Sequence, residues 1–351
     1  MPMLAETRTS IQRWQVTGDS TASERRGGGP PLWLVDWSDS EHEDFLWACT
    51  AAGVQARVLR GTALGTSVGR RRHRLRSWPT YASLALRGVR EAGGAPLIAW
   101  QPIAGAVAGL LRRRPGPHRH PRLVVLNPLI DPAVSTLRRR IMLRGTARAD
   151  RVLYFSAGAL EDAVRLGLDR QRLRFVPLGV KTTAAWRPPT GDYFLAVGRE
   201  ERDWVTLARA AEGLSCEVRV VGPADLPEPG SLKLLPQLER TRLLELMEGA
   251  RAIVVPLNPT ARSAGQLTVL DGISVGRAVV TTRAACVEDY IHPETGILVP
   301  PRDAAALRAA LLRLSSQALA EQMGMAALAA GRGAFSLERF VCDVDGEARS
   351  I

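Results

Sequence analysis

One stretch of the sequence combines residues suited to binding an anion. Ser263 and Gln266 match a capping box, and apolar residues at helical spacing follow, so a helix is expected to begin here. Two strand-like runs, 251–256 and 278–282, flank it and complete a strand, helix, strand unit. A helix N-terminus offers unpaired N–H groups and partial positive charge to an anion, and Gly265 allows a close approach of the backbone.

The segments around that unit alternate between strand and helix. One alternating series covers residues 31–180 and a second covers 192–335, with a Pro-containing linker at 181–191. Short apolar runs separated by helices are typical of parallel sheets covered on both faces. We therefore expect an α/β protein with two doubly wound, Rossmann-like domains that face each other across a cleft, where a ligand binds.

The apolar patterns also predict the bounds of individual elements. Strands are expected at 32–35, 55–59, 96–100, 122–126, 151–155, 173–176, 193–197, 217–221 and 231–235. Helices are expected at 41–52, 78–91, 103–113, 133–147, 159–166, 304–314, 318–330 and 337–344.

The ends of the chain and its cysteines bear on its location. Residues 1–30 are rich in Thr, Ser and Arg, have no apolar stretch of signal-peptide length, and are expected to form a flexible leader. The four cysteines are widely spaced, which indicates neither a zinc site nor a disulfide framework. These features favour a cytoplasmic protein without a transmembrane helix.

Several motifs, taken together, resemble the group-1 type of retaining, nucleotide-sugar-dependent glycosyltransferases, which have the GT-B fold. The segments that carry this resemblance are 149–156, 174–180, 262–282, 289–290, 295–301 and 303–307. The resemblance implies that the second domain binds a nucleotide-diphospho sugar and that the first binds the acceptor. It also implies that residues 336–351 form a helix or tail that crosses back to the first domain.

The resemblance further implies roles for single residues. Sugar transfer releases a diphosphate, so the site must stabilise negative charge on its oxygens. Arg199 matches an arginine that clamps the phosphates in the family, and Arg202 is expected to replace a lysine that this chain lacks. Donor contacts are expected from Gly198, Ser263, Ala264, Gly265, Gln266, Leu267, Thr268 and Asp271.

Two of these donor residues differ from the usual family pattern. Asp271 falls on the position that holds the ribose, where the family usually has Glu. Ser263 falls on the position of a first acidic residue near the sugar hydroxyls, although some members also carry Ser-Ala-Gly-Gln here. Without the resemblance, Ser263 would serve only as a helix cap and Asp271 only as a residue of a solvated face.

On the acceptor side, Asp36 stands where the family usually has a glycine-rich loop, and Asn127 stands where many members carry a His. Asp and Asn are also common turn formers, so a structural role is the alternative for both. The family's retaining reaction has no agreed protein nucleophile, so no catalytic base is assigned. Neither a metal nor another cofactor is expected, and the donor sugar is a substrate.

Charge is unequal between the two halves. Residues 31–180 contain 24 Arg and no Lys against 11 Asp and Glu, or +13, whereas residues 191–335 contain 15 Arg and Lys against 17 Asp and Glu, or −2. The basic first domain suits an anionic membrane surface or a lipid-linked or anionic acceptor, and the alternative is solvated helix ends. Nucleic acid is disfavoured, because aromatic residues make up only 5% of the chain.

Two other functions are compatible with the same patterns. A non-catalytic relative would keep the fold as a scaffold or regulatory partner, which the replacement at Ser263 and the missing lysine favour. A nucleotide-sugar epimerase or a phosphorylase-like enzyme would share the fold and most of the donor motifs.

Overall fold

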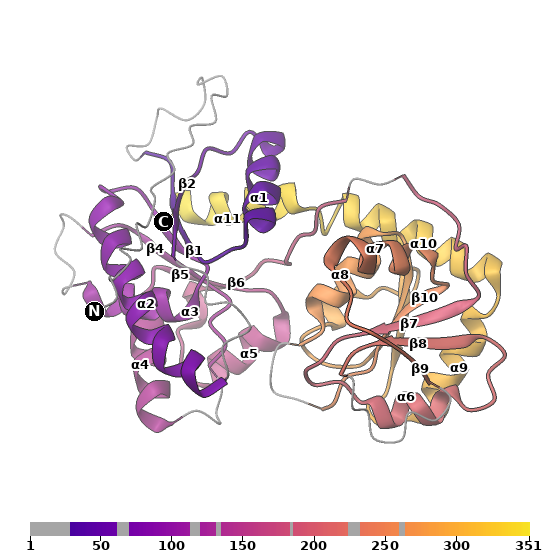
Figure 1. The fold of residues 1–351 in the computed structure, drawn as a ribbon. Coiled ribbons are helices and arrows are strands. Elements are labelled where there is room, and N and C mark those ends of the chain that lie inside the picture. Colours follow the sequence, from indigo (N-terminus) through magenta and orange to yellow (C-terminus); the bar gives the residue numbers. More distant parts are fainter. Residues whose placement is uncertain are drawn as a thin grey trace, which may run out of the picture. The chain divides into compact units, whose positions relative to one another are not determined.

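The computed structural model describes residues 29–61, 70–112, 120–130, 135–182, 185–223, 232–259 and 264–351, and for residues 70–77 it describes the backbone alone. The chain folds into two units (Figure 1). The first contains residues up to 155, then 160–176 and 341–351, and the second contains 156–159 and 177–340. The expected linker at 181–191 thus lies within the second unit.

The first unit is built on a six-stranded parallel sheet. Its strands run in the order β2-β1-β3-β4-β5-β6. Their bounds are Leu32–Val35 (β1), Arg57–Arg60 (β2), Leu97–Ala99 (β3), Leu123–Leu126 (β4), Arg151–Tyr154 (β5) and Leu173–Phe175 (β6). The connecting helices are Asp39–Ala52 (α1), Arg70–Glu91 (α2), Pro102–Leu111 (α3), Thr136–Thr146 (α4) and Ala157–Arg165 (α5). The central strands are fully buried, as continuous apolar runs in parallel sheets predict.

The second unit has a sheet of the same kind. Its six parallel strands run in the order β12-β11-β10-β7-β8-β9. The strands are Tyr193–Val197 (β7), Glu217–Val221 (β8), Leu232–Leu235 (β9), Ala252–Val255 (β10), Ala278–Thr282 (β11) and Gly296–Val299 (β12). The helices are Trp204–Ala211 (α6), Arg240–Gly249 (α7), Gln266–Ser274 (α8), Ala304–Leu314 (α9) and Gln317–Arg332 (α10). The last helix, Leu337–Arg349 (α11), begins in the second unit and lies from Val341 onward in the first. Helix α6 packs beside α9, and α8 packs beside α10 (Figure 1).

The predicted α/β class with two doubly wound parallel sheets is confirmed. Strands β7 and β8 and helix α9 have the predicted bounds, and the Asp303 carboxylate caps α9 by accepting the Ala306 N–H at 2.8 Å. The predicted start of α2 at Trp78 is wrong, because the helix begins at Arg70 and contains Pro79 in its interior. A proline is compatible with the first turn of a helix and is unfavourable in its interior, which is where α2 carries it.

Helices α3 and α4 pack with their backbones in contact. A Cβ atom added to Gly145 would overlap the carbonyl group of Ala106, and one added to Gly109 would overlap the carbonyl group of Gly145. Ala106 is itself fully buried. Small residues on both helices therefore set the distance between them, because any larger side chain would push the two backbones apart.

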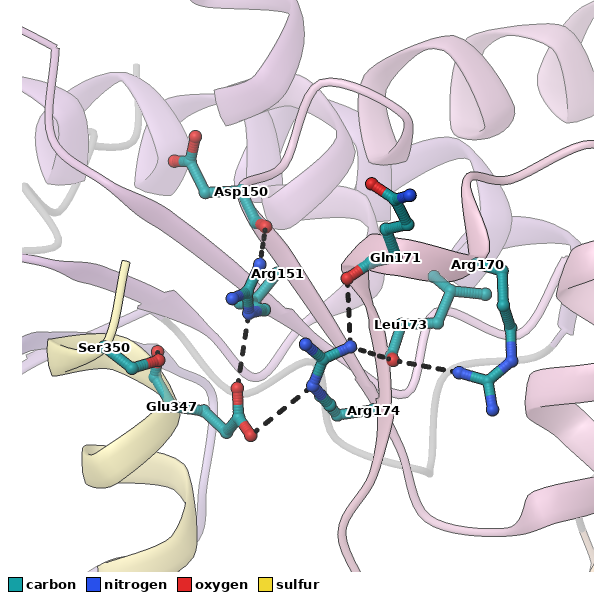
Figure 2. Close-up of polar contacts among 8 residues, drawn as sticks. All are labelled: Asp150, Arg151, Arg170, Gln171, Leu173, Arg174, Glu347 and Ser350. Carbon is teal, nitrogen blue, oxygen red and sulfur yellow. Dashed lines mark hydrogen bonds and ion pairs between the residues drawn. The ribbon is translucent and has the colours of Figure 1, made fainter.

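Glu347 of α11 attaches this helix to the sheet of the first unit (Figure 2). Its carboxylate lies 3.3 Å from Nε of Arg151 at the start of β5 and 3.7 Å from Nε of Arg174 in β6. Arg174 also donates to the backbone carbonyls of Gln171 and Leu173, at 2.9 and 2.8 Å. The C-terminal helix is thus joined to two strands of the sheet by a charge-assisted hydrogen bond to Arg151 and an ion pair with Arg174.

Other arginines of the first unit also donate to backbone carbonyl groups. Arg112 donates to the carbonyl of Arg148 at 2.8 Å, and Arg172 donates to that of Ala149 at 3.2 Å. Arg57 donates to the carbonyl of Ala92 at 2.9 Å. Part of the basic excess of this unit therefore has a structural role, since these carbonyls lie at helix ends and in loops where no regular partner exists.

Within the described residues, no helix combines the length and the apolar character needed to cross a membrane.

Candidate functional site

The candidate site of the second unit lies where the loops after β7 and β10 meet. These two strands are neighbours in the sheet, yet the chain leaves β7 toward β8 and leaves β10 toward β11 on the other side. Ligands of open α/β sheets bind at such a switch point, outside the carboxyl ends of the strands. The two loops are joined here, because the Asp203 N–H donates to the carbonyl of Pro256 at 3.0 Å and the Asn258 N–H to that of Glu201 at 3.0 Å.

Helix α8 begins at this switch point, and its start corrects the prediction. Gly265 is the N-cap, in the left-handed conformation with φ +82°, and no side chain caps the helix. Gln266 is the first helical residue and not the third, so the expected capping box with Ser263 is wrong; Ser263 itself lies outside the described residues. The first helical hydrogen bond runs from the Val269 N–H to the Gly265 carbonyl at 2.9 Å, which leaves the amides of the first turn without a helical acceptor.

Gly265 fits this position for two reasons. Its positive φ is disfavoured for residues with a side chain. A Cβ atom there would also lie 3.1 Å from methyl groups of Leu257 and Val255. Ala264, the residue before it, accepts a hydrogen bond from the Cys286 thiol at 3.2 Å through its carbonyl group. The backbone at the start of α8 is therefore fixed by packing from β10 and from the segment after β11.

Arg202 lies beside the first turn of α8 and holds the loop after β7. It donates to the carbonyls of Val197 and Glu200, at 3.0 and 2.9 Å, and to the Thr268 hydroxyl of α8 at 3.1 Å. Burial lowers the pKa of its guanidinium to about 10, so it remains charged at neutral pH. Gly198 has φ +137° and no side chain, and the guanidinium of Arg202 occupies the space where its Cβ atom would lie.

Arg199 differs from Arg202 in its surroundings. Its side chain is exposed, and within the described residues it makes neither a hydrogen bond nor an ion pair. The two arginines expected to meet the diphosphate are thus not equivalent. Arg202 brings positive charge to the start of α8 as part of the structure, whereas Arg199 is available to a ligand.

Asp271 lies one turn further along α8, on the same helix face as Thr268. Its carboxylate accepts two hydrogen bonds of 2.6 Å from the guanidinium of Arg240, one on each oxygen. The side chain of Asp271 is only 12% exposed, while that of Arg240 is 61% exposed. Sequence reasoning missed Arg240, which is the first residue of α7; the helical spacing of Leu243, Leu244 and Met247 is the signal that would have located this helix.

The first unit has a second candidate site, at its own switch point between β1 and β3. Asp36, directly after β1, accepts a hydrogen bond of 2.5 Å from the Tyr81 hydroxyl and another from the side-chain amide of Gln101, which follows β3. Burial, together with the hydrogen bond to Asp36, raises the pKa of Tyr81, so its hydroxyl stays protonated and donates. Asp36 is thereby held in one orientation.

Asn127 follows β4 at the same edge of the sheet. Its φ of +42° is unusual for a residue with a side chain, and its side-chain oxygen is buried without a hydrogen-bond donor among the described residues. Strand β3 separates β1 from β4, so Asp36 and Asn127 lie about 10 Å apart at strand spacing. Trp100, partly exposed, lies between aromatic neighbours, with ring centroids 5.1 Å from Trp37 and 5.7 Å from Phe155.

Comparison with known proteins identifies a family for part of the chain. Residues 185–317 match the family model described as Glycosyl transferases group 1. No curated protein matches the sequence.

Solved structures match nearly the whole chain. A sucrose-phosphate synthase from Thermosynechococcus elongatus is 17% identical with a TM-score of 0.69, over 92% of this chain and 98% of that one. HepE from Anabaena, in complex with UDP-glucose, is 15% identical with a TM-score of 0.64, over 92% and 100%. A lipopolysaccharide outer core galactosyltransferase is 13% identical with a TM-score of 0.65, over 92% and 99%. The predicted GT-B fold and the predicted family resemblance are both confirmed.

Proposed function

We propose that the chain transfers a sugar from a nucleoside diphosphate sugar to an acceptor, with retention of anomeric configuration, since residues 185–317 match the family model of the group 1 glycosyl transferases. The proposal rests on the order of the polar groups along one face of α8. It presents the amides of the first helical turn, then Thr268 with Arg202, then Asp271 with Arg240. A helix rises 1.5 Å per residue, so Asp271 lies about 6 Å along the axis from Leu267.

This arrangement suits a nucleoside diphosphate. The diphosphate would bind at the N-terminus of α8, where the amides of Gln266, Leu267 and Thr268 and the exposed Arg199 meet its negative charge. The ribose would lie one turn further, where its hydroxyls can donate to Asp271. In this proposal protein groups, and not a metal ion, stabilise the departing diphosphate. Ser263, Ala264, Gly265 and Gly198 complete the donor contacts.

The acceptor would bind on the first unit at Asp36 and Asn127. Asp36 is oriented by two hydrogen bonds and can accept from a hydroxyl, and Asn127 has a buried acceptor oxygen with capacity to spare. Trp100, which follows β3 between them, is an aromatic residue of the kind that sugar rings pack against. A hydroxyl-bearing acceptor, lipid-linked or anionic, agrees with this composition and with the basic first unit.

The test of the donor site is thermal unfolding with UDP, GDP, ADP and their sugars. A ligand at 100 times its dissociation constant adds about 2.7 kcal/mol, which raises the melting temperature by roughly 5 °C or more. We expect one nucleoside diphosphate to give this shift, and we expect Asp271→Ala and Arg199→Ala each to reduce it.

Arg313→Ala is the matched control, since Arg313 is an exposed residue at the end of α9, away from the switch point, and should leave the shift intact. No shift with any nucleotide would contradict the proposal and would favour a non-catalytic scaffold. Release of the free sugar or of an epimer without transfer to an acceptor would favour an epimerase or phosphorylase-like enzyme.

We also propose that the first unit docks on an anionic membrane surface through α4. Leu137 is 67% exposed, and Arg140 and Arg144 follow it on the same helix face and are exposed. An apolar side chain flanked by cations is suited to the interface of an anionic bilayer, where each Arg contributes about 1 kcal/mol.

Vesicle co-sedimentation tests the membrane proposal. The wild type should bind phosphatidylcholine vesicles that contain phosphatidylglycerol and not pure phosphatidylcholine, and Leu137→Glu with Arg140→Glu should weaken binding by roughly tenfold or more. A control with the same change of charge at the end of α5, Arg165→Glu with Leu166→Glu, should bind like the wild type. Equal binding to both vesicle types, or to neither, would refute this docking.

A further inference from the structure

The position of Arg240 is unusual for a helix. It is the first residue of α7, and the first turn of this helix contains no acidic residue. A cation at a helix N-terminus is unfavourable, because the helix dipole places positive charge there. The guanidinium of Arg240 makes a double hydrogen bond to Asp271, which offsets this cost.

Asp271 in turn depends on Arg240. A carboxylate that is nearly enclosed by protein loses most of its hydration, and a charged hydrogen-bond partner offsets that loss. The guanidinium supplies two parallel N–H donors, which fix the plane of the carboxylate as well as its charge. Each oxygen keeps a further lone pair, so the fixed carboxylate can still accept two hydrogen bonds from outside.

We infer that Arg240 is a positioning residue that sets Asp271 to recognise the two ribose hydroxyls of the nucleotide. This inference rests on the proposed function, in which the ribose lies beside Asp271. A vicinal diol donates two hydrogen bonds that are nearly side by side, and a carboxylate with its two oxygens fixed matches that pair. The site thus selects ribonucleotides over deoxynucleotides, although Arg240 does not itself bind the hydroxyls.

Arg240 also removes an electrostatic conflict. Asp271 lies about one helical turn from the N-terminus of α8, where the diphosphate is proposed to bind. A lone carboxylate at that distance would repel a diphosphate, whereas a carboxylate paired with a guanidinium is neutral as a unit. The pair keeps the hydrogen-bond acceptors that the ribose needs without the repulsion.

The experiment measures the dissociation constants of UDP, GDP and ADP and of their 2′,3′-dideoxy analogues by calorimetry. For the base that binds, the wild type should bind the dideoxy analogue about tenfold or more weakly, the effect of leaving a buried acceptor without its donors. In Arg240→Ala this ratio should fall to about twofold, because the carboxylate loses its fixed orientation. Arg240→Lys should give an intermediate ratio, since an ammonium lacks the planar pair of donors.

A matched control lies on the same helix. Arg242 is 74% exposed and pairs with Glu245 at 2.6 Å, so Arg242→Ala removes a similar ion pair without touching Asp271 and should keep the wild-type ratio. Asp271→Asn should abolish the discrimination, and adding Arg240→Ala to it should cause little further change, because the two residues act as one unit. This double variant answers the question even where Arg240→Ala alone weakens folding.

Each outcome has one meaning. If Arg240→Ala keeps the wild-type ratio of dideoxy to ribo dissociation constants, the inference is overturned. The pair of Arg240 and Asp271 then has only a structural role. An equal loss of affinity for ribo and dideoxy ligands also overturns it, because Arg240 would then contribute charge alone. Failure of the wild type to bind any of the three diphosphates rejects the proposed function itself, and the inference with it; that result appears before any variant is made.

Discussion

Alanine at position 145 is expected to destabilise the first unit by about 3 kcal/mol or more, the upper part of the range for overpacking a core. The added Cβ would overlap the carbonyl group of Ala106 in α3, and a backbone group cannot rotate away as a side chain can. Helices α3 and α4 would have to separate, which opens voids along their whole contact. Urea denaturation followed by circular dichroism measures the effect.

Gly346→Ala is the control for Gly145→Ala. Gly346 also lies within a helix, α11, but a Cβ atom there has no neighbour within 4 Å. Alanine should therefore be neutral or stabilise by up to about 1 kcal/mol, since it is the better helix former. If Gly145→Ala unfolds at the same urea concentration as the wild type, α3 and α4 do not meet as described.

The second large effect is expected on ligand binding. Gly265→Val should weaken nucleoside diphosphate binding at least tenfold, because the first turn of α8 cannot keep its position. A β-branched residue at φ +82° costs about 1–3 kcal/mol, and its Cβ would press on Leu257 and Val255. Relief of that strain moves the amides that are proposed to bind the diphosphate. Calorimetric titration with the nucleotide identified by thermal unfolding provides the measurement.

A control with the same backbone cost exists in the same unit. Gly213 follows α6 with φ +63°, and the nearest atom to a Cβ there is 3.8 Å away, in Arg308. Gly213→Val should lower the stability by a similar amount and leave the dissociation constant unchanged. If Gly265→Val keeps the wild-type affinity, or if both variants lose affinity equally, the start of α8 is not part of the binding site.

The sheets could be predicted from the sequence because their strands are short and mostly apolar, and the central ones, β1, β3, β4, β7, β10 and β11, are buried throughout. Strands β7 and β8 have the predicted bounds, and both consist of residues whose pattern allows few alternatives. The start of α8 could not be predicted in the same way. Ser263 and Gln266 have the spacing of a capping box, but the helix begins after Gly265. The left-handed conformation of Gly265 cannot be recognised from the spacing of Ser263 and Gln266.

The partner of Asp271 could not be predicted either. Arg240 lies 31 residues earlier in the chain and reaches Asp271 only because α7 and α8 are brought together by the sheet. Arg202, in contrast, was placed near the site from proximity in sequence, and the structure puts it beside α8, with backbone carbonyls as its main partners. Composition alone did not distinguish arginines that support the backbone from those available to a ligand.

The split composition of the first unit has a consequence for synthesis of the protein on the ribosome. Residues 341–351 belong to this unit, yet they leave the exit tunnel only after the whole of 177–340 has been made. Until then Arg151 and Arg174 lack the carboxylate of Glu347. The second unit therefore has the first opportunity to finish folding, although its residues are translated later.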